Sequence, residues 1–198
     1  MNPDEETVKE VGPIWGELHG GLWHTTHPER FVEILECGAI LPEPKKIPND
    51  DRWSTSQGPK HYPYVRFIGG VSLFDFHEFD PKSYQSKCPN SNWREFVPYR
   101  RVWDGAVWIE IDREHTSPCF LSGGDLFTKW DSSGDWGHKL MPYIEAAYLG
   151  PLPLTALRRA LFIRAMDYGR FHELEIREFS RSAYEVLLNG WREDCKMT

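Results

Sequence analysis

The stretch from Lys139 to Arg164, KLMPYIEAAYLGPLPLTALRRALFIR, constrains the fold most because it holds a single carboxylate within a mainly apolar run. Apolar residues precede and follow Glu145 in alternation, so we predict a short strand over residues 141–149 with both faces covered. An ionised carboxylate removed from water costs on the order of several kcal/mol unless it is paired or hydrogen-bonded. Glu145 therefore either has a structural partner or faces a ligand cavity.

The length of 198 residues predicts one domain, residues 1–198, because a domain typically has about 100–200 residues. Residues 1–13 are polar and acidic and are expected to form a loose lead-in. Aromatic residues make up 14% of the chain, and 16 Gly and 15 Pro interrupt it often. This combination indicates short elements, long loops and an aromatic-lined cleft.

The formal net charge of −7 argues against broad electrostatic capture of nucleic acid, which depends on Lys and Arg, but it leaves room for a local basic groove. The four cysteines contain no Cys-x-x-Cys pair, which argues against a zinc knuckle and a disulfide framework. No apolar run reaches the ~18 residues of a membrane span, and the N-terminus lacks the pattern of a secretory signal. We expect a cytoplasmic protein without a membrane partner.

A short strand over residues 21–25 is predicted to carry His24, and a helix follows it directly. Thr26 is the expected N-cap, Glu29 its capping-box partner, and Gly38 the end of the helix. The predicted order is therefore strand, His-Thr turn and helix.

Further along the chain, a strand over residues 65–76 is expected to be interrupted by Gly69-Gly70, where the backbone can approach a ligand or form a bulge. Residues 122–138, rich in Gly, Asp and Ser, are expected to form a flexible loop that leads into Glu145. The other predicted elements are a long loop at 42–64, a long loop or weak helix at 79–97, strands at 105–112, 119–121 and 161–165, and a helix at 181–189.

Three segments together resemble the ADP-ribosyltransferase superfamily, of the type that has a His, an aromatic or Ser strand, and a Glu. They are LWHTTHPERFVEILECGAI, with a His, a small hydroxyl residue and a helix ending in Gly; GGVSLFDF; and YIEAAYLGPLPLTAL, with a Glu strand and an apolar Gly- and Pro-containing stretch. The resemblance implies an α+β fold, an ADP-ribosyltransferase-like split β-sandwich with flanking helices, which grips NAD in the cleft between two small sheets. NAD would be a substrate, and no metal is implied.

The roles implied by the resemblance are specific. His24 would bind ribose hydroxyls of NAD, and the backbone of Thr25 would hold the nicotinamide amide. Ser72 would support Glu145 or the ribose, and Glu145 would stabilise the positive charge that develops as nicotinamide leaves. The aromatic residue that stacks on nicotinamide would be one of Phe74, Phe76 and Tyr64.

One position departs from the pattern of arginine-modifying members, which usually carry a Glu or Gln two residues before the catalytic Glu. Tyr143 stands there in this chain. The expected acceptor of ADP-ribose is therefore not arginine but a nucleic-acid base, a protein side chain or a small molecule, as in a toxin, a defence protein or another modifier. Trp130, Trp136 and His138 are the expected acceptor contacts, with the tryptophans able to stack on a base.

Three alternatives stay open. The steps His24-Thr25-Thr26 and His115-Thr116-Ser117 resemble those of two-His phosphoesterases, in which two histidines act as general acid and base. His19, His24 and His27 have spacings that can ligate zinc, but Pro28 and the lack of Cys or Asp partners argue against a metal site. The chain could also be a non-catalytic nucleotide- or partner-binding module of the same fold.

Overall fold

The chain combines helices and strands, as expected for an α+β protein. The computed structural model describes residues 5–45, 58–91, 93–115, 119–167 and 170–197. The helices are α1 Glu5–Val11, α2 Trp15–Leu18, α3 Arg30–Cys37, α4 Tyr64–Phe67, α5 Pro81–Lys87, α6 Gly123–Ser133 and α7 Arg181–Met197. The strands are β1 Leu22–Thr26, β2 Ala39–Ile40, β3 Gly70–Asp75, β4 Gly105–Ile111, β5 Phe120–Leu121, β6 Glu145–Leu149, β7 Leu152–Pro153, β8 Leu157–Arg164 and β9 Phe171–Leu174.

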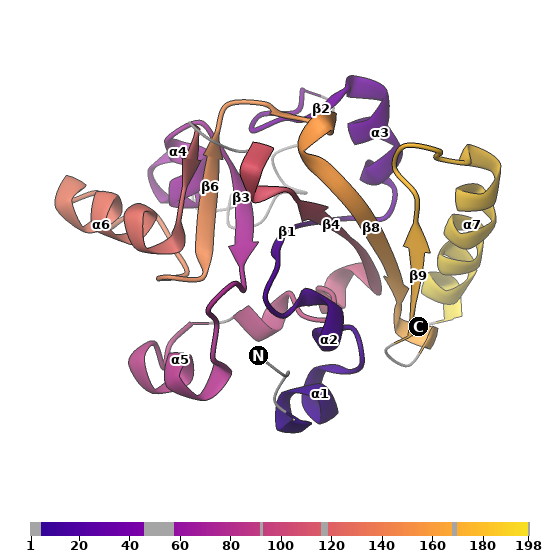
Figure 1. The fold of residues 1–198 in the computed structure, drawn as a ribbon, viewed down its shortest axis with the longest axis horizontal. Helices are drawn as coiled ribbons and strands as arrows, with labels where there is room; N and C mark the ends of the chain where they lie inside the picture. The colour runs from indigo at the N-terminus through magenta and orange to yellow at the C-terminus, as the bar shows by residue number, and fades with distance from the viewer. Residues whose placement is uncertain (1–4, 46–57, 92, 116–118, 168–169, 198) are drawn as a thin grey trace.

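Among the described residues, seven strands form one sheet in the order β5-β6-β3-β1-β4-β8-β9, and all of its neighbouring pairs are antiparallel. A second sheet consists of β2 and β7. Figure 1 shows α6 and α4 beside β6 and β3 at one end of the large sheet, and α7 beside β9 at the other. The predicted α+β class is confirmed at this level.

The large sheet separates two apolar cores, because alternate side chains of each strand point to opposite faces. One core joins Trp23 of β1 and Trp108 of β4 to the N-terminal helices α1 and α2. The other joins Leu22 of β1 and Ile109 of β4 to α3 and α7. Helices therefore cover both faces, and α1, where a loose lead-in is expected, contributes to the first core.

The sheet opens between β1 and β3, and this opening positions the site. β1 pairs with β3 only at Leu22 and Trp23, whereas it pairs with β4 from Trp23 to Thr26. From His24 onward the two strands therefore diverge, and the sheet divides into a β5-β6-β3 half and a β1-β4-β8-β9 half (Figure 1).

Several predicted boundaries are wrong for identifiable reasons. Thr26 does not cap a helix, because it continues β1 and pairs with Val107, and α3 begins only at Arg30. Residues 65–67, expected to be strand, belong to α4, and Gly69 in the left-handed region (φ 74°) reverses the chain before β3. Gly38 ends α3 in the left-handed conformation, as predicted.

Residues 123–133 form α6 in place of the expected flexible loop. The hydroxyl of Ser122 accepts a hydrogen bond from the backbone N–H of Asp125 at 3.2 Å and caps the helix. Leu126 of this helix is fully buried and packs in a cluster that includes Ala147 of β6. Tertiary packing and the cap therefore outweigh the poor helix propensity of the Gly-, Asp- and Ser-rich sequence.

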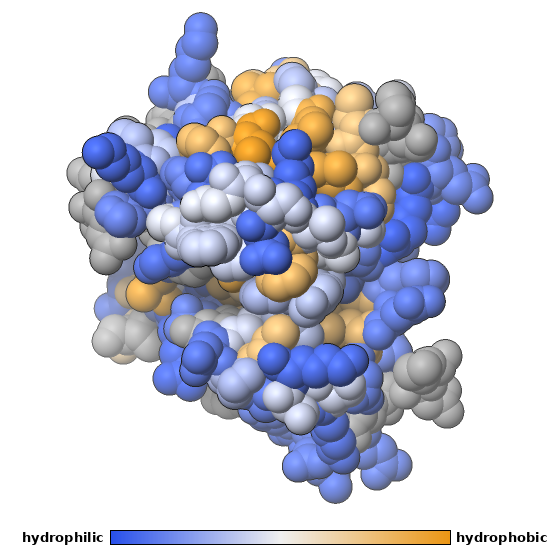
Figure 2. Space-filling view, turned by 90° about the vertical axis from the view of Figure 1, so that its left-hand side faces the viewer, coloured by the Kyte–Doolittle hydropathy of each residue, from blue (hydrophilic) through white to orange (hydrophobic). Residues whose placement is uncertain are grey.

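The side of the molecule formed by α4, α6 and β6, at the left of Figure 1, faces the viewer in Figure 2. Hydrophobic residues gather toward the top of this face, and the lower part is mainly hydrophilic. Within the described residues, no helix is both long enough and apolar enough to cross a membrane.

Candidate functional site

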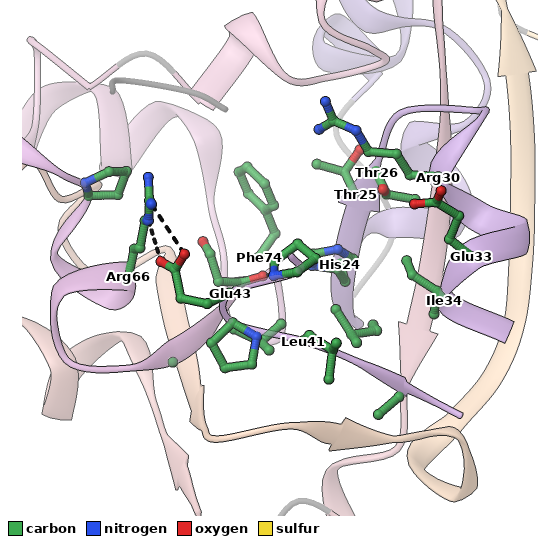
Figure 3. Close-up of a pocket in the computed structure, with 18 of the residues that line it drawn as sticks. His24, Thr25, Thr26, Arg30, Glu33, Ile34, Leu41, Glu43, Arg66 and Phe74 are labelled. Atoms are coloured by element: carbon green, nitrogen blue, oxygen red, sulfur yellow. Dashed lines mark hydrogen bonds and ion pairs between the residues drawn. The ribbon is translucent and has the colours of Figure 1, made fainter. Parts of the chain in front are cut away.

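A cavity of about 510 Å³ lies where the two halves of the sheet diverge, and its walls come from β1, α3, the segment after β2, α4 and β3 (Figure 3). Small-molecule sites commonly have volumes of about 300–1,000 Å³ and mainly apolar walls with a few polar groups. His24, Thr25, Ser72, Phe74 and Glu145 all line this cavity. The tertiary structure thus brings together five of the residues predicted to form the site.

Glu145 is the most buried acid in this cavity, with 1% of its surface exposed. The hydroxyl of Ser72 donates to Oε1 at 2.7 Å, and the backbone N–H of Met141 donates to Oε2 at 3.0 Å. Register explains the first contact: Phe74 of β3 lies opposite Glu145 of β6, so Ser72 is the diagonal neighbour on the same face. Each carboxylate oxygen therefore has its own donor.

Residues 141–144 form a tight turn before β6 instead of the first part of the predicted strand. Tyr143 has a φ of 63°, a left-handed conformation that is uncommon for a residue with a side chain. The backbone N–H of Glu145 donates to the carbonyl of Met141 at 3.0 Å, and the side chain of Glu145 accepts from Met141 in return. The turn therefore fixes both the backbone and the carboxylate of Glu145.

His24 joins the other half of the sheet to this pair. Its Nδ1 lies 3.0 Å from the carbonyl oxygen of Ser72, at the point where β1 and β3 no longer pair through their backbones. A carbonyl oxygen only accepts, so Nδ1 carries the proton. Burial lowers the pKa of His24, which keeps the ring neutral, although the bond to Ser72 opposes this effect. Nε2 is then an acceptor suited to a hydroxyl group.

Burial raises the pKa of the Glu145 carboxyl above its ordinary value, while the hydrogen bonds from Met141 and Ser72 partly oppose that shift. The folded protein therefore holds this proton at pH values where the unfolded chain has lost it. Stability contributed by Glu145 is full below the unfolded pKa and falls as pH rises through the folded pKa.

This sign leads to a measurable pH dependence. We expect the unfolding free energy of wild type to fall relative to that of Glu145→Gln as pH is raised from about 4 to about 8, because only wild type must ionise a buried carboxyl. Urea unfolding of both proteins across this range measures the difference, in which the other titrating groups cancel. A constant difference, or one that changes in wild type's favour as pH rises, would contradict the assigned shift.

Five other predicted contacts, Tyr64, Phe76, Trp130, Trp136 and His138, do not lie on the cavity wall. Tyr64 is 1% exposed and packs in the apolar cluster with Leu126, so it is not placed to stack on a ligand there. The indole N–H of Trp130 donates to the carbonyl of His138 at 3.0 Å. The ring of His138 stacks on Phe67 with centroids 3.9 Å apart, and its Nδ1 lies 2.8 Å from the Tyr62 carbonyl.

Trp136, by contrast, is 65% exposed, and Tyr143 is 50% exposed with its ring 4.5 Å from that of Phe127. Tyr143 is therefore an exposed aromatic group two residues from Glu145. Phe74, the predicted aromatic residue on the cavity, is joined there by Phe96 and Trp103. Phe76 is fully buried in the core and does not line the cavity.

The residues behind two of the alternatives are not brought together. His115 is 58% exposed and pairs with Asp112, and it does not line the cavity with His24; Thr116 and Ser117 lie outside the described residues. In the described part of the chain, no three His, Cys, Asp or Glu side chains are grouped so that they could hold a metal ion.

The charged groups Arg30, Glu33, Glu43, Lys45 and Arg66 also line the cavity, and sequence reasoning missed them as site residues. Arg66 had a detectable signal, because it interrupts the apolar stretch YVRFIGGV much as Glu145 interrupts its own. The Met141 donor had none, since it is a backbone group whose direction depends on the turn.

No model of a known protein family matches the sequence, and no match is found among curated proteins. Function is therefore inferred from the chemistry of the site.

Proposed function

We propose that the chain is an NAD-dependent ADP-ribosyltransferase that acts on a non-arginine acceptor. The observation that carries this proposal is the convergence of His24, Ser72 and Glu145, which come from three separate strands, on one cavity where the sheet divides. The divided sheet and the flanking helices also suit the split β-sandwich that the resemblance implies.

The chemistry of the pair Ser72–Glu145 fits cleavage of a glycosidic bond to a cationic leaving group. When the bond between nicotinamide nitrogen and ribose C1′ breaks, its electron pair goes to the nicotinamide, and positive charge develops on the ribose. A preorganised carboxylate in a water-poor site stabilises that charge. The acceptor then forms a bond to C1′, and its proton passes to solvent.

The raised pKa of Glu145 is compatible with this role. The nicotinamide ring of NAD is itself positively charged, and an opposite charge nearby favours the ionised form of a carboxyl. Binding of NAD would therefore lower the pKa of Glu145, so that its carboxyl is ionised when positive charge develops on the ribose. Neutral His24, with Nε2 as an acceptor, would bind a ribose hydroxyl.

The acceptor is proposed to approach from the side of Tyr143, which is exposed and next to the Glu145 turn. An aromatic ring there suits stacking with a nucleic-acid base or another planar group. A guanidinium acceptor would find no carboxylate at this position, which supports a non-arginine acceptor.

Two histidine variants distinguish this proposal from a two-His phosphoesterase. We expect His24→Ala to lower nicotinamide release from NAD by about tenfold or more, because a hydrogen bond in the site is lost. His115→Ala should leave the rate unchanged, since His115 lies off the cavity. Release of labelled nicotinamide measures both rates, with candidate acceptors present.

A parallel assay with a 2′,3′-cyclic nucleotide tests the other reading. If wild type hydrolyses the cyclic phosphate and both variants lose that activity, the phosphoesterase assignment replaces the transferase. Absence of nicotinamide release from wild type with every acceptor class would favour a non-catalytic binding module.

A further inference from the structure

Arg66 of α4 is held at the cavity wall from two directions. The guanidinium Cζ lies 3.8 Å from the centroid of the Tyr62 ring. Its Nη2 donates to Oε2 of Glu43 at 3.2 Å, and its Nε donates to the other oxygen, Oε1 (Figure 3). The result is a two-bond pairing between the planar guanidinium and a carboxylate, which is both strong and geometrically specific.

The two partners of this ion pair are unequally buried. The side chain of Arg66 is 14% exposed, whereas that of Glu43 is 53% exposed. Arg66 therefore belongs to the cavity wall, and Glu43 reaches it from the segment 41–45 that follows β2. Moving the Glu43 carboxylate into water costs little free energy, because it is already half exposed. The Arg66 guanidinium, in contrast, would be a poorly solvated charge without an anion beside it.

Arg66 is also fixed relative to the Ser72–Glu145 pair. Gly70 begins β3 directly after the α4 turn, and a Cβ atom there would lie 3.2 Å from the carbonyl oxygen of Val65 and 3.3 Å from that of Tyr148. The absence of a side chain lets α4 fold tightly onto β3 and β6. The guanidinium and the Glu145 carboxylate are thus held on one packed unit and line the same cavity.

We infer that Arg66 is the binding site for a phosphate group of the ligand, and that Glu43 of the same chain occupies this site as an internal competitor. Phosphate oxygens accept the same pair of parallel N–H bonds as a carboxylate does. Entry of the ligand exchanges one anion for another at Arg66, and Glu43 turns to solvent. The inference rests on the proposed function only in expecting an adenosine-diphosphate group as the source of the phosphate.

Calorimetric binding of ADP and of uncharged adenosine tests this exchange. Glu43→Gln should bind ADP about two- to fivefold more tightly than wild type, because this factor corresponds to the interaction free energy of a half-exposed ion pair. Its affinity for adenosine should be unchanged. Arg66→Gln should weaken ADP binding by about tenfold or more.

Glu36→Gln is the matched control. It removes the same charge from α3, but Glu36 pairs with the exposed Arg181 and does not line the cavity. ADP affinity equal to that of wild type is expected for it. If Glu36→Gln gains as much ADP affinity as Glu43→Gln, the change in overall charge explains the effect and the inference is overturned.

Two further results would overturn it: equal ADP affinity of Glu43→Gln and wild type, or no ADP binding by either protein. Glu43 is half-exposed, so its substitution is not expected to prevent folding, and it carries the test even if Arg66→Gln is unstable. If Glu43→Gln binds ADP more tightly but wild type releases no nicotinamide from NAD, the proposed transferase activity is refuted and the phosphate site at Arg66 still stands.

Discussion

Glu145→Gln is expected to reduce nicotinamide release from NAD by about 100- to 1,000-fold, the usual cost of removing a preorganised electrostatic group from a transition state. The amide keeps the size of the side chain and can still accept from Ser72 or Met141, so the cavity should keep its shape. NAD affinity should change much less than the rate, because the positive charge on the ribose develops only in the transition state. Single-turnover release and equilibrium binding measure the two quantities.

Glu33→Gln is the matched control for this experiment. Glu33 lines the same cavity from α3, but it is not among the groups that contact Ser72 or Glu145. Its neutralisation is expected to change the release rate by only a few-fold. Equal rates for wild type and Glu145→Gln would remove Glu145 from the mechanism and, with it, the proposed activity.

Gly123→Ala is expected to cost about 2 kcal/mol or more of unfolding free energy and to impair the site. A Cβ atom at residue 123 would lie 1.9 Å from the carbonyl oxygen of Tyr143, a distance that forces backbone to move. Because Tyr143 belongs to the turn that aims the Met141 N–H at Glu145, the shift also reaches the carboxylate. For a chain of this size the loss corresponds to a drop of about 4–8 °C in Tm.

Gly124→Ala is a control at the adjacent position of the same helix. A Cβ atom there would have only the Ser122 hydroxyl oxygen nearby, at 3.9 Å. Alanine also favours helix over glycine by up to about 1 kcal/mol. Thermal unfolding should therefore show opposite signs for the two variants, and a Gly123→Ala protein as stable as Gly124→Ala would show that α6 does not constrain the turn.

The positive φ of Tyr143 also bears on the side from which the acceptor is proposed to approach. The left-handed conformation places an aromatic residue on the outside of the turn, where it is half exposed and contacts Phe127 of α6. The segment expected to be a flexible loop is thus a helix that supports both the turn before Glu145 and the exposed aromatic group. In the proposed reaction, acceptor recognition and the placement of Glu145 would depend on the same backbone turn.

Much of the candidate site could be predicted because its polar residues stand out from the apolar sequence around them. Glu145 is an acid in an apolar run, and His24 stands at the end of a strand beside hydroxyl residues. Gly69-Gly70 were expected to let the backbone approach a ligand or form a bulge; instead, Gly69 adopts a left-handed turn and Gly70 lies close to the carbonyls of Val65 and Tyr148. The strand predicted at 105–112 is confirmed as β4, since its alternation matches a pleated, buried strand.

The expected loop at 122–138 shows where local composition misleads. Gly and Ser are poor helix formers, yet Ser122 caps α6 and Leu126 anchors it in a buried cluster. The Ser-x-x-Asp pattern of Ser122 and Asp125 is the local signal for the start of this helix. The predicted acceptor residues Trp130 and His138 do not line the cavity, because the Trp130 indole bonds to the His138 carbonyl and the His138 ring bonds to the Tyr62 carbonyl.

The amino-acid sequence by itself determined which chemical groups are available, and the order of His24, Ser72 and Glu145 along strands whose apolar patterns require burial. The tertiary structure alone decided that these groups meet, because their contacts depend on the register of β3 with β6 and on the divergence of β1 from β3 at His24. Three further contacts also depend on the tertiary structure: the hydrogen bond from the Met141 N–H to Glu145, the packing of α6 against the turn, and the Arg66–Glu43 ion pair. Such contacts join residues far apart in sequence or backbone groups common to every residue, so no local pattern records them.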